Sequence, residues 1–240
     1  MSVRYSPFCG EQGCNLLALR PLFMLDLAVK MLCAYLLGSV VGSLLLGSLS
    51  GVDIRSFGSG NAGGTNALRT QGKWFALGVI AIDIGKGWLA TTLLPTIYVP
   101  GVVQSWPSNW LMCSCALAAI IGHVYPIWYE FRGGKGAATL FGAILGVAPY
   151  TLLPVIAVWA LIIVLTGYVG LATMLASVAL PVVMVARRWP TPDTGMLCFA
   201  LLAAVFVIYT HRANIARMLQ GTEHRAHRVW LFGRRKTVDR

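Results

Sequence analysis

A run of 51 residues, from Gly136 to Ala186, contains no Asp, Glu, Lys, Arg or His. One helix in a water-soluble core cannot hide so long an uncharged stretch, so several consecutive helices must lie in lipid. The whole chain of 240 residues is 57% hydrophobic, with a mean hydropathy of +0.72. This length suits one helical bundle without a large soluble domain. We therefore predict an all-α, polytopic transmembrane bundle.

Apolar stretches separated by glycine, proline and charge predict about seven short helices. They are expected at residues 27–50, 74–98, 109–122, 137–148, 152–166, 170–186 and 194–210. Two of the connecting loops, 51–73 and 123–136, carry basic residues, whereas 99–109 carries no charge. The positive-inside rule then places both basic loops and the C-terminus in the cytoplasm and the N-terminus outside.

This orientation requires an even number of crossings between the second basic loop and the C-terminal tail. Four short helices satisfy the requirement. The segments 137–148 and 152–166 are, however, shorter than the roughly 20 residues of a straight span. A single kinked span over both segments is the alternative, and it would break the even count.

The two ends of the chain differ from the membrane region 25–223. Residues 1–24 do not resemble a cleavable signal peptide, and our hypothesis is that translation begins at Met24. The net charge is +11, and 8 of the 19 basic residues lie between Arg212 and Arg240. A basic cytoplasmic tail at 224–240 that faces anionic lipid explains this charge, and the absence of a nucleic-acid motif argues against nucleic acid as a partner.

The first of three polar segments, "FGSGNAGGTNALRTQGK", begins at Phe57. It contains GxGxxG, and Asp83 follows Gly63 by twenty residues. We reject a dinucleotide site because both flanks are membrane helices rather than a βαβ unit. Glycines such as Gly60 still let backbone N–H groups converge on an anion. Neutral and charged hydrogen-bonding side chains accompany them: Ser59, Asn61, Thr65, Asn66 and Arg69. A flexible glycine loop is the alternative.

The second polar segment, "GHVYPIWYEFRGGKGAAT", contains Gly133-Gly134-Lys135-Gly136. It is not a P-loop, because the first glycine is missing and Gly136 replaces the Ser or Thr that would hold magnesium. A lysine between glycines at the start of a helix nevertheless suits a phosphate oxygen. Simple anchoring of Lys135 at the lipid headgroups is the alternative. His123 opens the segment and could be a structural hydrogen-bonding residue or a proton carrier.

The third polar segment, "HRANIARMLQGTEHR", follows the last apolar helix. His211 and Asn214 share one helical face, whereas Arg212 and Arg217 are each expected to extend to the lipid surface. Within the second span, Asp83 and Lys86 are three residues apart, which fits a functional site and a mutually neutralising pair equally well.

The predicted topology puts all three polar segments at the cytoplasmic face, where they can form one pocket. Glycine loops, neutral donors, Arg69 and Lys135 indicate a site for anionic substrates, most simply phosphates. Four acidic residues lie near this face, Asp53, Glu130, Glu223 and Asp239, too few and too dispersed for a metal centre. We therefore predict no bound metal and no cofactor.

The three segments closely resemble the signature regions of the bacterial acyl-phosphate-dependent glycerol-3-phosphate acyltransferases, in the same order along the chain. The resemblance covers about residues 25–223. It implies transfer of a fatty acyl group from acyl phosphate to the 1-hydroxyl of glycerol-3-phosphate, which gives 1-acylglycerol-3-phosphate and phosphate in phospholipid biosynthesis. It also implies a seven-helix protein of the bacterial cytoplasmic (inner) membrane, and a functional link to an enzyme that produces acyl phosphate.

The resemblance implies functions for particular residues. Matching positions are Ser59, Asn61, Thr65, Asn66, Arg69, Gly134, Lys135, His211 and Asn214; we add Gly60, Gly133, Gly136 and His123 from the pattern itself. We expect Lys135 and the glycines to bind the acyl phosphate, and Arg69, His211 and Asn214 to bind glycerol-3-phosphate. Either His123 or a substrate phosphate oxygen takes the hydroxyl proton; the resemblance favours the phosphate.

One region departs from the family pattern. In "TGYVGLAT", Gly167 and Gly170 stand where the family usually has an arginine and a serine, so one substrate contact is missing or is supplied by Thr173 or Ser177. A transporter of phosphate or organic phosphates is the main rival function, although no inverted repeat is evident. A non-catalytic lipid-binding scaffold is a third possibility.

Overall fold

Helices are the only regular elements in the part of the chain that the structure describes, which is residues 16–100, 106–188, 190–227 and 229–233 of a computed structural model. The α-helices are α1 (Leu16–Gly38), α2 (Gly42–Leu49), α3 (Gly64–Thr70), α4 (Lys73–Thr92), α5 (Ser108–Val124), α6 (Ala137–Val147), α7 (Leu152–Thr166), α8 (Val169–Arg188), α9 (Thr194–Thr210) and α10 (Arg212–Leu219). Short 3-10 helices are η1 (Ile54–Ser56), η2 (Leu94–Thr96), η3 (Ile127–Tyr129), η4 (Pro149–Thr151) and η5 (Leu231–Gly233). The all-α prediction is confirmed.

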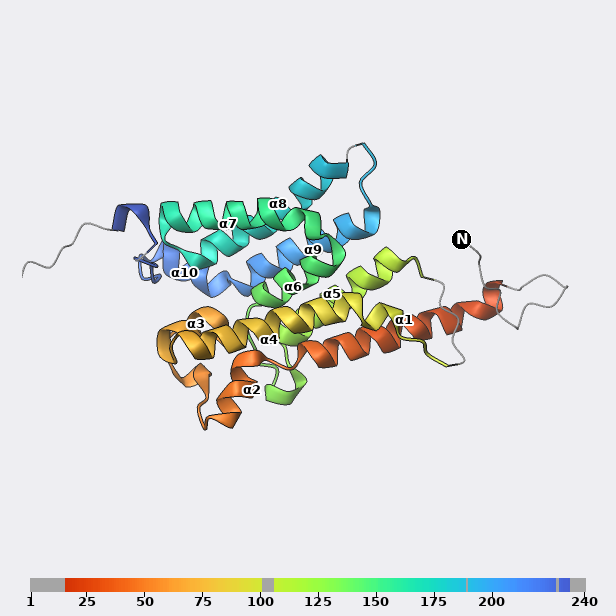
Figure 1. Ribbon diagram of the computed structural model, residues 1–240, viewed down its shortest axis with the longest axis horizontal. Coiled ribbons are helices and arrows are strands. Elements are labelled where there is room, and N and C mark those ends of the chain that lie inside the picture. Colours follow the sequence, from red (N-terminus) through yellow and green to blue (C-terminus); the bar gives the residue numbers. More distant parts are fainter. Residues whose placement is uncertain (1–15, 101–105, 189, 228, 234–240) are drawn as a thin grey trace, which may run out of the picture.

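The helices form an elongated bundle with two outer groups and a shared centre (Figure 1). α1 and α4 lie on one side, α7 and α8 lie on the other, and α5 and α6 lie between them. One apolar core joins α5, α6, α8 and α9 around the fully buried Phe199 and Leu180. A second core joins α1, α4 and α5 around Leu111. The short helices α2, α3 and α10 lie at one end of the bundle.

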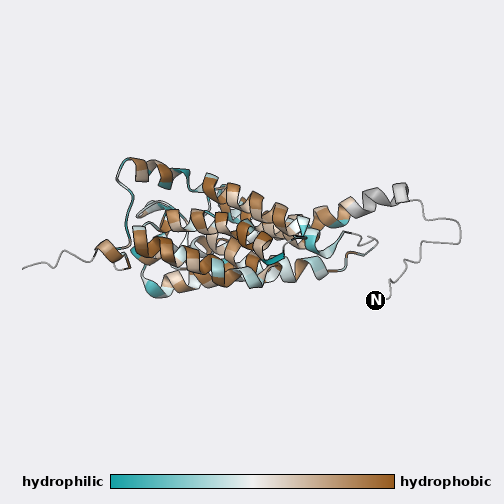
Figure 2. Cartoon of the chain, turned by 90° about the horizontal axis from the view of Figure 1, so that it is seen from above, coloured by the Kyte–Doolittle hydropathy of each residue, from teal (hydrophilic) through white to brown (hydrophobic). Residues whose placement is uncertain are grey.

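Hydrophobic residues predominate along the long helices, as the colouring of Figure 2 shows. Four helical segments are long and apolar enough to cross a membrane: Lys73–Thr96, Ser108–Tyr129, Pro149–Thr166 and Val169–Arg188. Two bent pairs, which join α1 to α2 and α9 to α10, raise the number of candidates to six among the described residues. α6 is shorter, with 11 residues. The count of seven spans and the direction of the termini therefore stay predictions.

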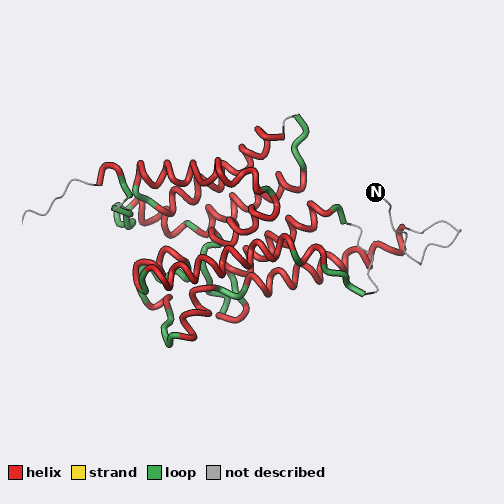
Figure 3. Tube along the Cα trace, viewed as in Figure 1, coloured by secondary structure: helices red, strands yellow, loops and turns green. Residues whose placement is uncertain are grey.

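The short segments around residues 137–166 form two helices, and the alternative of one kinked span is wrong. The chain reverses direction at η4 between α6 and α7 (Figure 3). α6 packs against α4, whereas α7 packs against α8 on the other side of the bundle. Pro149 ends the first helix because it lacks the N–H that a continuous helix would need.

The first predicted span, 27–50, is not one straight helix. α1 ends at Gly38, α2 starts at Gly42, and the two axes meet at an angle of 49°. The break exposes backbone groups that lipid cannot satisfy, and side chains of α4 satisfy them instead. Asp83 accepts a hydrogen bond from Gly42 N at 3.0 Å, and Lys86 donates to Val40 O at 2.8 Å.

The ends of the chain extend the predictions without testing them fully. α1 begins at Leu16 and runs without interruption through Met24, and the remainder of the predicted leader, residues 1–15, lies outside the described part. Part of the predicted tail is packed, because η5 contacts α7. Residues 234–240 of that tail also lie outside the described part.

Small residues let α4 and α6 approach closely at the centre. A Cβ atom added to Gly87 of α4 would overlap the carbonyl oxygen of Thr139 in α6. Likewise, a Cβ atom added to Gly142 of α6 would overlap Ile84 O of α4. Close backbone approach is a common way to associate helices in lipid, where van der Waals contact replaces the hydrophobic driving force. The contact fixes the N-terminus of α6 beside α4.

Candidate functional site

A cavity of about 510 Å³ opens where the three polar segments meet. The first segment contributes Ser59, Asn61, Thr65, Asn66 and Arg69; the second contributes His123 and Lys135; the third contributes His211, Asn214, Arg217 and Glu223. The expectation that distant loops form one pocket is met. Its size and mixed lining are typical of small-molecule sites.

Asn66 orders the glycine loop rather than facing the cavity with free groups. This side chain is 1% exposed. Its Nδ2 donates to Ile54 O at 3.2 Å and to Phe57 O at 3.0 Å, and its Oδ1 accepts from Ser59 N at 3.0 Å. A Cβ atom on Gly58 would overlap Oδ1, and φ at this position is +59°, so glycine is needed there. Asn66 therefore holds Ser59 at the cavity wall.

Arg55 ties the first polar segment to the second. Its guanidinium forms a salt bridge with Asp53 at 2.8 Å, and Nη1 donates to Tyr129 O at 3.2 Å and Arg132 O at 3.3 Å. The Asp53 carboxylate raises the pKa of Arg55, so the charge is permanent. Arg55 is one of the basic residues of loop 51–73, which served the sequence analysis as a topology signal alone. Its fork-shaped side chain instead joins two loops that border the cavity.

The Gly-Gly-Lys-Gly segment binds back onto the end of α5. Gly133 N donates to Val124 O and Gly134 N donates to His123 O, each at 3.1 Å. These two N–H groups therefore already have backbone acceptors, and the expected contact of Gly133 and Gly134 with substrate stays a prediction. A Cβ atom on Gly134 would overlap His123 Nε2, so the glycine is required by close approach. Gly136, with φ of +83°, is the N-cap of α6.

Lys135 lies just before the N-terminus of α6, and Ala137 and Ala138 of its first turn line the cavity. The first N–H groups of a helix have no partner within the helix and attract anions. Burial is the main cause that lowers the pKa of Lys135 to about 8, and the positive charges of Arg217 and Arg69 lower it further. The predicted phosphate-binding lysine thus faces the cavity beside a free helix end.

A chain of polar contacts crosses the cavity wall from Lys135. Its Nζ donates to Asn214 Oδ1. The amide Nδ2 of Asn214 donates to Glu223 Oε1 at 2.7 Å, and Glu223 Oε2 accepts from Arg217 Nε at 2.6 Å. Glu223 is 6% exposed and Arg217 is 34% exposed at the side chain. The carboxylate therefore fixes which end of the Asn214 amide faces Lys135, because a carboxylate can only accept.

His211 presents a nitrogen acceptor to the cavity. Its Nδ1 lies 2.8 Å from the carbonyl oxygen of Val207. Because a carbonyl oxygen only accepts, Nδ1 carries the hydrogen and Nε2 of the neutral ring has a free lone pair. His211 is 4% exposed and lines the cavity together with Asn214. This assignment follows from the hydrogen-bond network.

His123 belongs to a second polar cluster on the cavity wall, with Asp83 and Lys86. The ammonium of Lys86 has three acceptors: Val40 O at 2.8 Å, Asp83 Oδ1 at 2.9 Å and His123 Nδ1 at 2.8 Å. His123 Nδ1 also lies 3.3 Å from Asp83 Oδ1. Because an ammonium only donates, we assign Nδ1 as the acceptor for Lys86 and Nε2 as the nitrogen that carries the hydrogen. Asp83 and Lys86 form a mutually neutralising pair, which was one of the two interpretations of the sequence. Both side chains also form hydrogen bonds with the backbone at the break between α1 and α2.

Apolar side chains line another part of the cavity, which we call its apolar arm. It is lined by Ile80, Ile84, Ile144, Val155, Ile156 and Trp159, from α4, α6 and α7. The cavity therefore joins a cationic end to a surface that fits a hydrocarbon chain.

Not every predicted residue lines the cavity. Gly60, Gly133, Gly134 and Gly136 shape its loops without lining it. Arg212 stacks on Tyr209 at 4.5 Å, outside the lining, as expected for a residue at the lipid surface. Arg217 was expected there too, but its pairing with Glu223 turns it into the cavity wall. The sequence offered no signal for this pair, because side chains six residues apart do not share a helix face and Glu223 lies beyond the end of α10.

Comparison with known proteins identifies the architecture. The family model of glycerol-3-phosphate acyltransferase matches residues 28–221. The chain belongs to the glycerol-3-phosphate acyltransferase family. The glycerol-3-phosphate acyltransferase of Chlorobaculum parvum is 37% identical over 88% of this chain and 100% of its own length. That of Chlorobium limicola is 36% identical over 84% of this chain and 97% of its own length.

Solved structures agree with this acyltransferase assignment. The glycerol 3-phosphate form of PlsY (YgiH), an integral membrane glycerol 3-phosphate acyltransferase, aligns with a TM-score of 0.74 and 32% identity over 83% of this chain and 95% of its own. The lysophosphatidic acid form aligns with a TM-score of 0.72 over the same shares. The protein is thus a glycerol-3-phosphate acyltransferase of the integral membrane type.

Gly167 and Gly170 lie beside the third polar segment and the residues that follow it. A Cβ atom on Gly170 would lie 3.0 Å from the amide of Asn214, and one on Gly167 would lie 3.2 Å from Arg225 and Trp230. Thr173 and Ser177 both line the cavity. Their hydroxyl groups donate to carbonyl oxygens one turn back in α8, Val169 O and Met174 O.

Proposed function

We propose that this acyltransferase moves a fatty acyl group from acyl phosphate to the 1-hydroxyl of glycerol-3-phosphate. The products are 1-acylglycerol-3-phosphate and inorganic phosphate. The observation that carries the proposal is the form of the cavity: a cationic end with Lys135 and Arg69 is continuous with an apolar arm. A donor that joins a phosphate directly to a hydrocarbon chain through an acyl group matches both ends.

The polar end supplies charge stabilisation and positioning, which is what a reactive donor requires. An acyl phosphate already has a good leaving group, so the enzyme must mainly orient two anions and stabilise developing negative charge. We assign Lys135 and the N-terminus of α6 to the acyl-phosphate group. We assign Arg69, His211 and Asn214 to glycerol-3-phosphate, with Ser59, Asn61 and Thr65 as neutral hydrogen-bonding groups on the opposite wall.

The proton of the attacking hydroxyl goes to an oxygen of the leaving phosphate in this proposal. The hydroxyl oxygen forms the ester bond with the acyl carbon, the acyl–phosphate bond breaks, and hydrogen phosphate departs with the proton. His123 is poorly suited as the base because Lys86 occupies its Nδ1 and its Nε2 carries hydrogen. His211 Nε2 is suited to accept a hydrogen bond from the substrate hydroxyl and orient it.

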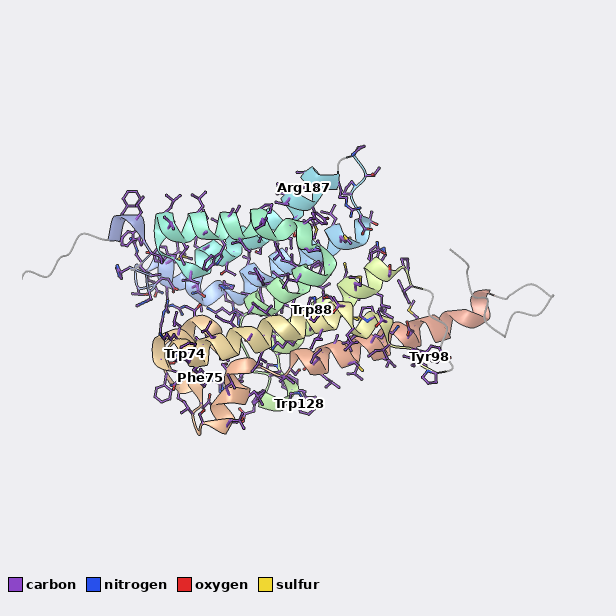
Figure 4. The ribbon with its side chains drawn as sticks, in the orientation of Figure 1. Trp74, Phe75, Trp88, Tyr98, Trp128 and Arg187 are labelled. Atoms are coloured by element: carbon purple, nitrogen blue, oxygen red, sulfur yellow. The ribbon has the colours of Figure 1, made fainter. Side chains whose placement is uncertain are left out.

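The proposed setting is the cytoplasmic face of a bacterial inner membrane. The cavity end of the bundle carries Arg55, Arg69, Lys73 and Lys135, in agreement with the positive-inside rule. Figure 4 shows Trp74 beside this end and Arg187 at the far end of α8. Acyl phosphate reaches the site from an enzyme that produces it, and the apolar arm lets its chain stay in lipid.

The test uses purified protein in detergent with radiolabelled glycerol-3-phosphate and either palmitoyl phosphate or palmitoyl-CoA. We expect labelled lysolipid from palmitoyl phosphate alone, and loss of the product in Lys135→Ala but not in Lys73→Ala. Labelled lysolipid from palmitoyl-CoA alone would overturn the proposed donor. No lysolipid from either donor, together with uptake of glycerol-3-phosphate into proteoliposomes, would favour the transporter instead.

A further inference from the structure

The last residues of the third polar segment and those that follow it fold back onto the turn between α7 and α8 (Figure 1). Ala226 N donates to Gly167 O at 2.8 Å, and Trp230 Nε1 donates to Leu165 O at 3.1 Å. We call Arg225, Ala226 and Trp230 the C-terminal clasp. These residues lie beyond residue 221, where the match to the family model ends.

Arg225 sits between two aromatic rings. Its guanidinium carbon is 4.7 Å from the ring centroid of Tyr168 and 4.3 Å from that of Trp230. Each distance is within the range of a cation–π interaction, which strengthens when the cation loses part of its water. Arg225 is only partly exposed. The clasp therefore has one charged residue held from both sides and two hydrogen bonds to the turn.

Gly167 makes room for the clasp. Its φ is +75°, a conformation that L side chains rarely adopt, and a Cβ atom there would lie 3.2 Å from the Cβ atoms of both Arg225 and Trp230. A larger residue at this position would press against both members of the clasp. The space left by Gly167 is thus filled by side chains from the C-terminal segment.

The clasp is connected to the cavity through Glu223, two residues before Arg225. Glu223 N donates to Arg217 O at 3.1 Å, and its carboxylate accepts from Arg217 and from the Asn214 amide. On the other side, His224 lies close to Arg69, whose charge is the main cause that lowers the pKa of His224. The segment thus runs from the α7–α8 turn along the third polar segment towards α3.

We propose that Arg225 and Trp230 are positioning residues for the acyl transfer: they clamp the C-terminal segment on the α7–α8 turn, so that Glu223 holds the Asn214 amide with its oxygen towards Lys135. The inference rests on the proposed function for its kinetic effect. Without the clamp, the non-helical segment after Gly221 loses its attachment to the α7–α8 turn, and the amide loses its fixed orientation.

The kinetic test compares Trp230→Ala with Trp230→Phe and with the matched control Trp74→Ala. Trp74 is 75% exposed and also stacks with a cation, Lys73 at 5.1 Å, but it does not line the cavity. We expect kcat/KM for glycerol-3-phosphate to fall roughly tenfold in Trp230→Ala, because a cation–π contact and a hydrogen bond are lost. Trp230→Phe keeps the ring and should recover most of the activity.

The pH profile distinguishes positioning from a general loss of folded enzyme. Burial is the main cause that lowers the pKa of Lys135; among the charged groups, Arg217 and Arg69 lower this pKa and Glu223 raises it. Release of Glu223 in Trp230→Ala should move the alkaline limb of kcat/KM to lower pH. Activity equal to that of Trp74→Ala, or a lower activity with the wild-type pH profile, would overturn the proposal.

Hydrogen exchange tests the clasp independently of turnover. In the wild type the amides of Glu223 and Ala226 are hydrogen-bonded, so peptides over residues 222–227 should exchange slowly. Trp230→Ala should speed their exchange while α5 peptides stay unchanged, and equal exchange in both proteins would contradict the clasp. An inactive wild type with the expected exchange difference would reject the acyl-phosphate reaction and keep the clasp.

Discussion

Lys86 and Lys135 are both drawn into the interior of the same bundle, yet the partners around each ammonium differ. Lys86 is 3% exposed at the side chain and donates to a carbonyl, a carboxylate and an imidazole from three segments. Lys135 is partly buried at a cavity, and Asn214 is the acceptor that the structure records for it among the described residues. We call the Lys86 cluster closed because its ammonium has three protein partners, and the Lys135 cluster open because its ammonium also faces a cavity.

The difference shows how a buried charge in a membrane protein can be assigned. An ammonium has three hydrogens, and the Lys86 cluster uses all of them within the protein. Its charges satisfy the break between α1 and α2, so its function is structural. Lys135 lines a cavity beside a helix N-terminus, where a ligand can supply further partners to its ammonium.

The largest effect is expected from Lys86→Ala, which breaks the closed cluster. The change leaves Asp83 buried without its cation and Val40 O without a donor. The free energy of unfolding should fall by about 3–5 kcal/mol, the usual cost of removing one partner of a buried pair. Denaturant unfolding in detergent measures it, with the exposed Lys73→Ala as control. A stability equal to that of the control would show that the cluster is not structural.

Lys135→Ala should lower activity strongly and stability little, which is the reverse of the effect expected for Lys86→Ala. We expect kcat to fall by about 10²–10³-fold, as for loss of one group that stabilises developing charge. The free energy of unfolding should change by no more than about 1 kcal/mol, because the cavity already admits water. Lysolipid formation and denaturant unfolding are measured on the same preparation. A large loss of stability would place Lys135 in the structural class with Lys86.

The pH dependence of activity gives a further test of the function of Lys135. Burial lowers the pKa of Lys135 to about 8, so its positive charge is present below this pH and is lost above it. Activity should therefore fall by about tenfold per pH unit on the alkaline side. In Lys135→Arg the charge persists to much higher pH, so this limb should disappear even if the rate is lower. An identical limb in both proteins would assign the titration to another group.

The smallest effect is expected from Arg55→Lys. A lysine keeps a charge near Asp53 but cannot span Tyr129 O and Arg132 O with a planar fork. The loss of one such hydrogen bond corresponds to about 1 kcal/mol, or several-fold in KM for glycerol-3-phosphate. Arg132→Lys is the matched control, because its backbone oxygen rather than its side chain is the partner. Equal KM values in the two variants would show that the loops do not need this bridge.

Much of the membrane architecture could be predicted from local pattern. The helices from Leu152 to Thr166 and from Thr194 to Thr210 have the predicted bounds, because long apolar runs have few alternatives in lipid. The break after Gly38 could not be predicted. It depends on Asp83 and Lys86 of another helix, and no pattern within residues 27–50 contains them.

The functional site, too, could be predicted from the sequence only in part. Segments rich in glycine and hydrogen-bonding groups were recognisable because such residues are costly beside apolar helices unless they have a use. The contacts of the individual residues could not be predicted. Asn66 orders its own loop, and the N–H groups of Gly133 and Gly134 donate to carbonyl oxygens of α5. A hydrogen-bond partner that is distant in sequence decides whether a polar group is free for a ligand.

By itself the sequence determined that this chain is a membrane-embedded helical acyltransferase and which three segments meet at its site, since hydrophobic run length, basic loops and long motifs are properties of the chain order. Tertiary structure alone decided that Lys86 is closed, that Lys135 is open, and that Glu223 sets the amide of Asn214. The physical reason is that a buried polar group forms hydrogen bonds with groups that are near it in space, and tertiary packing determines which groups those are.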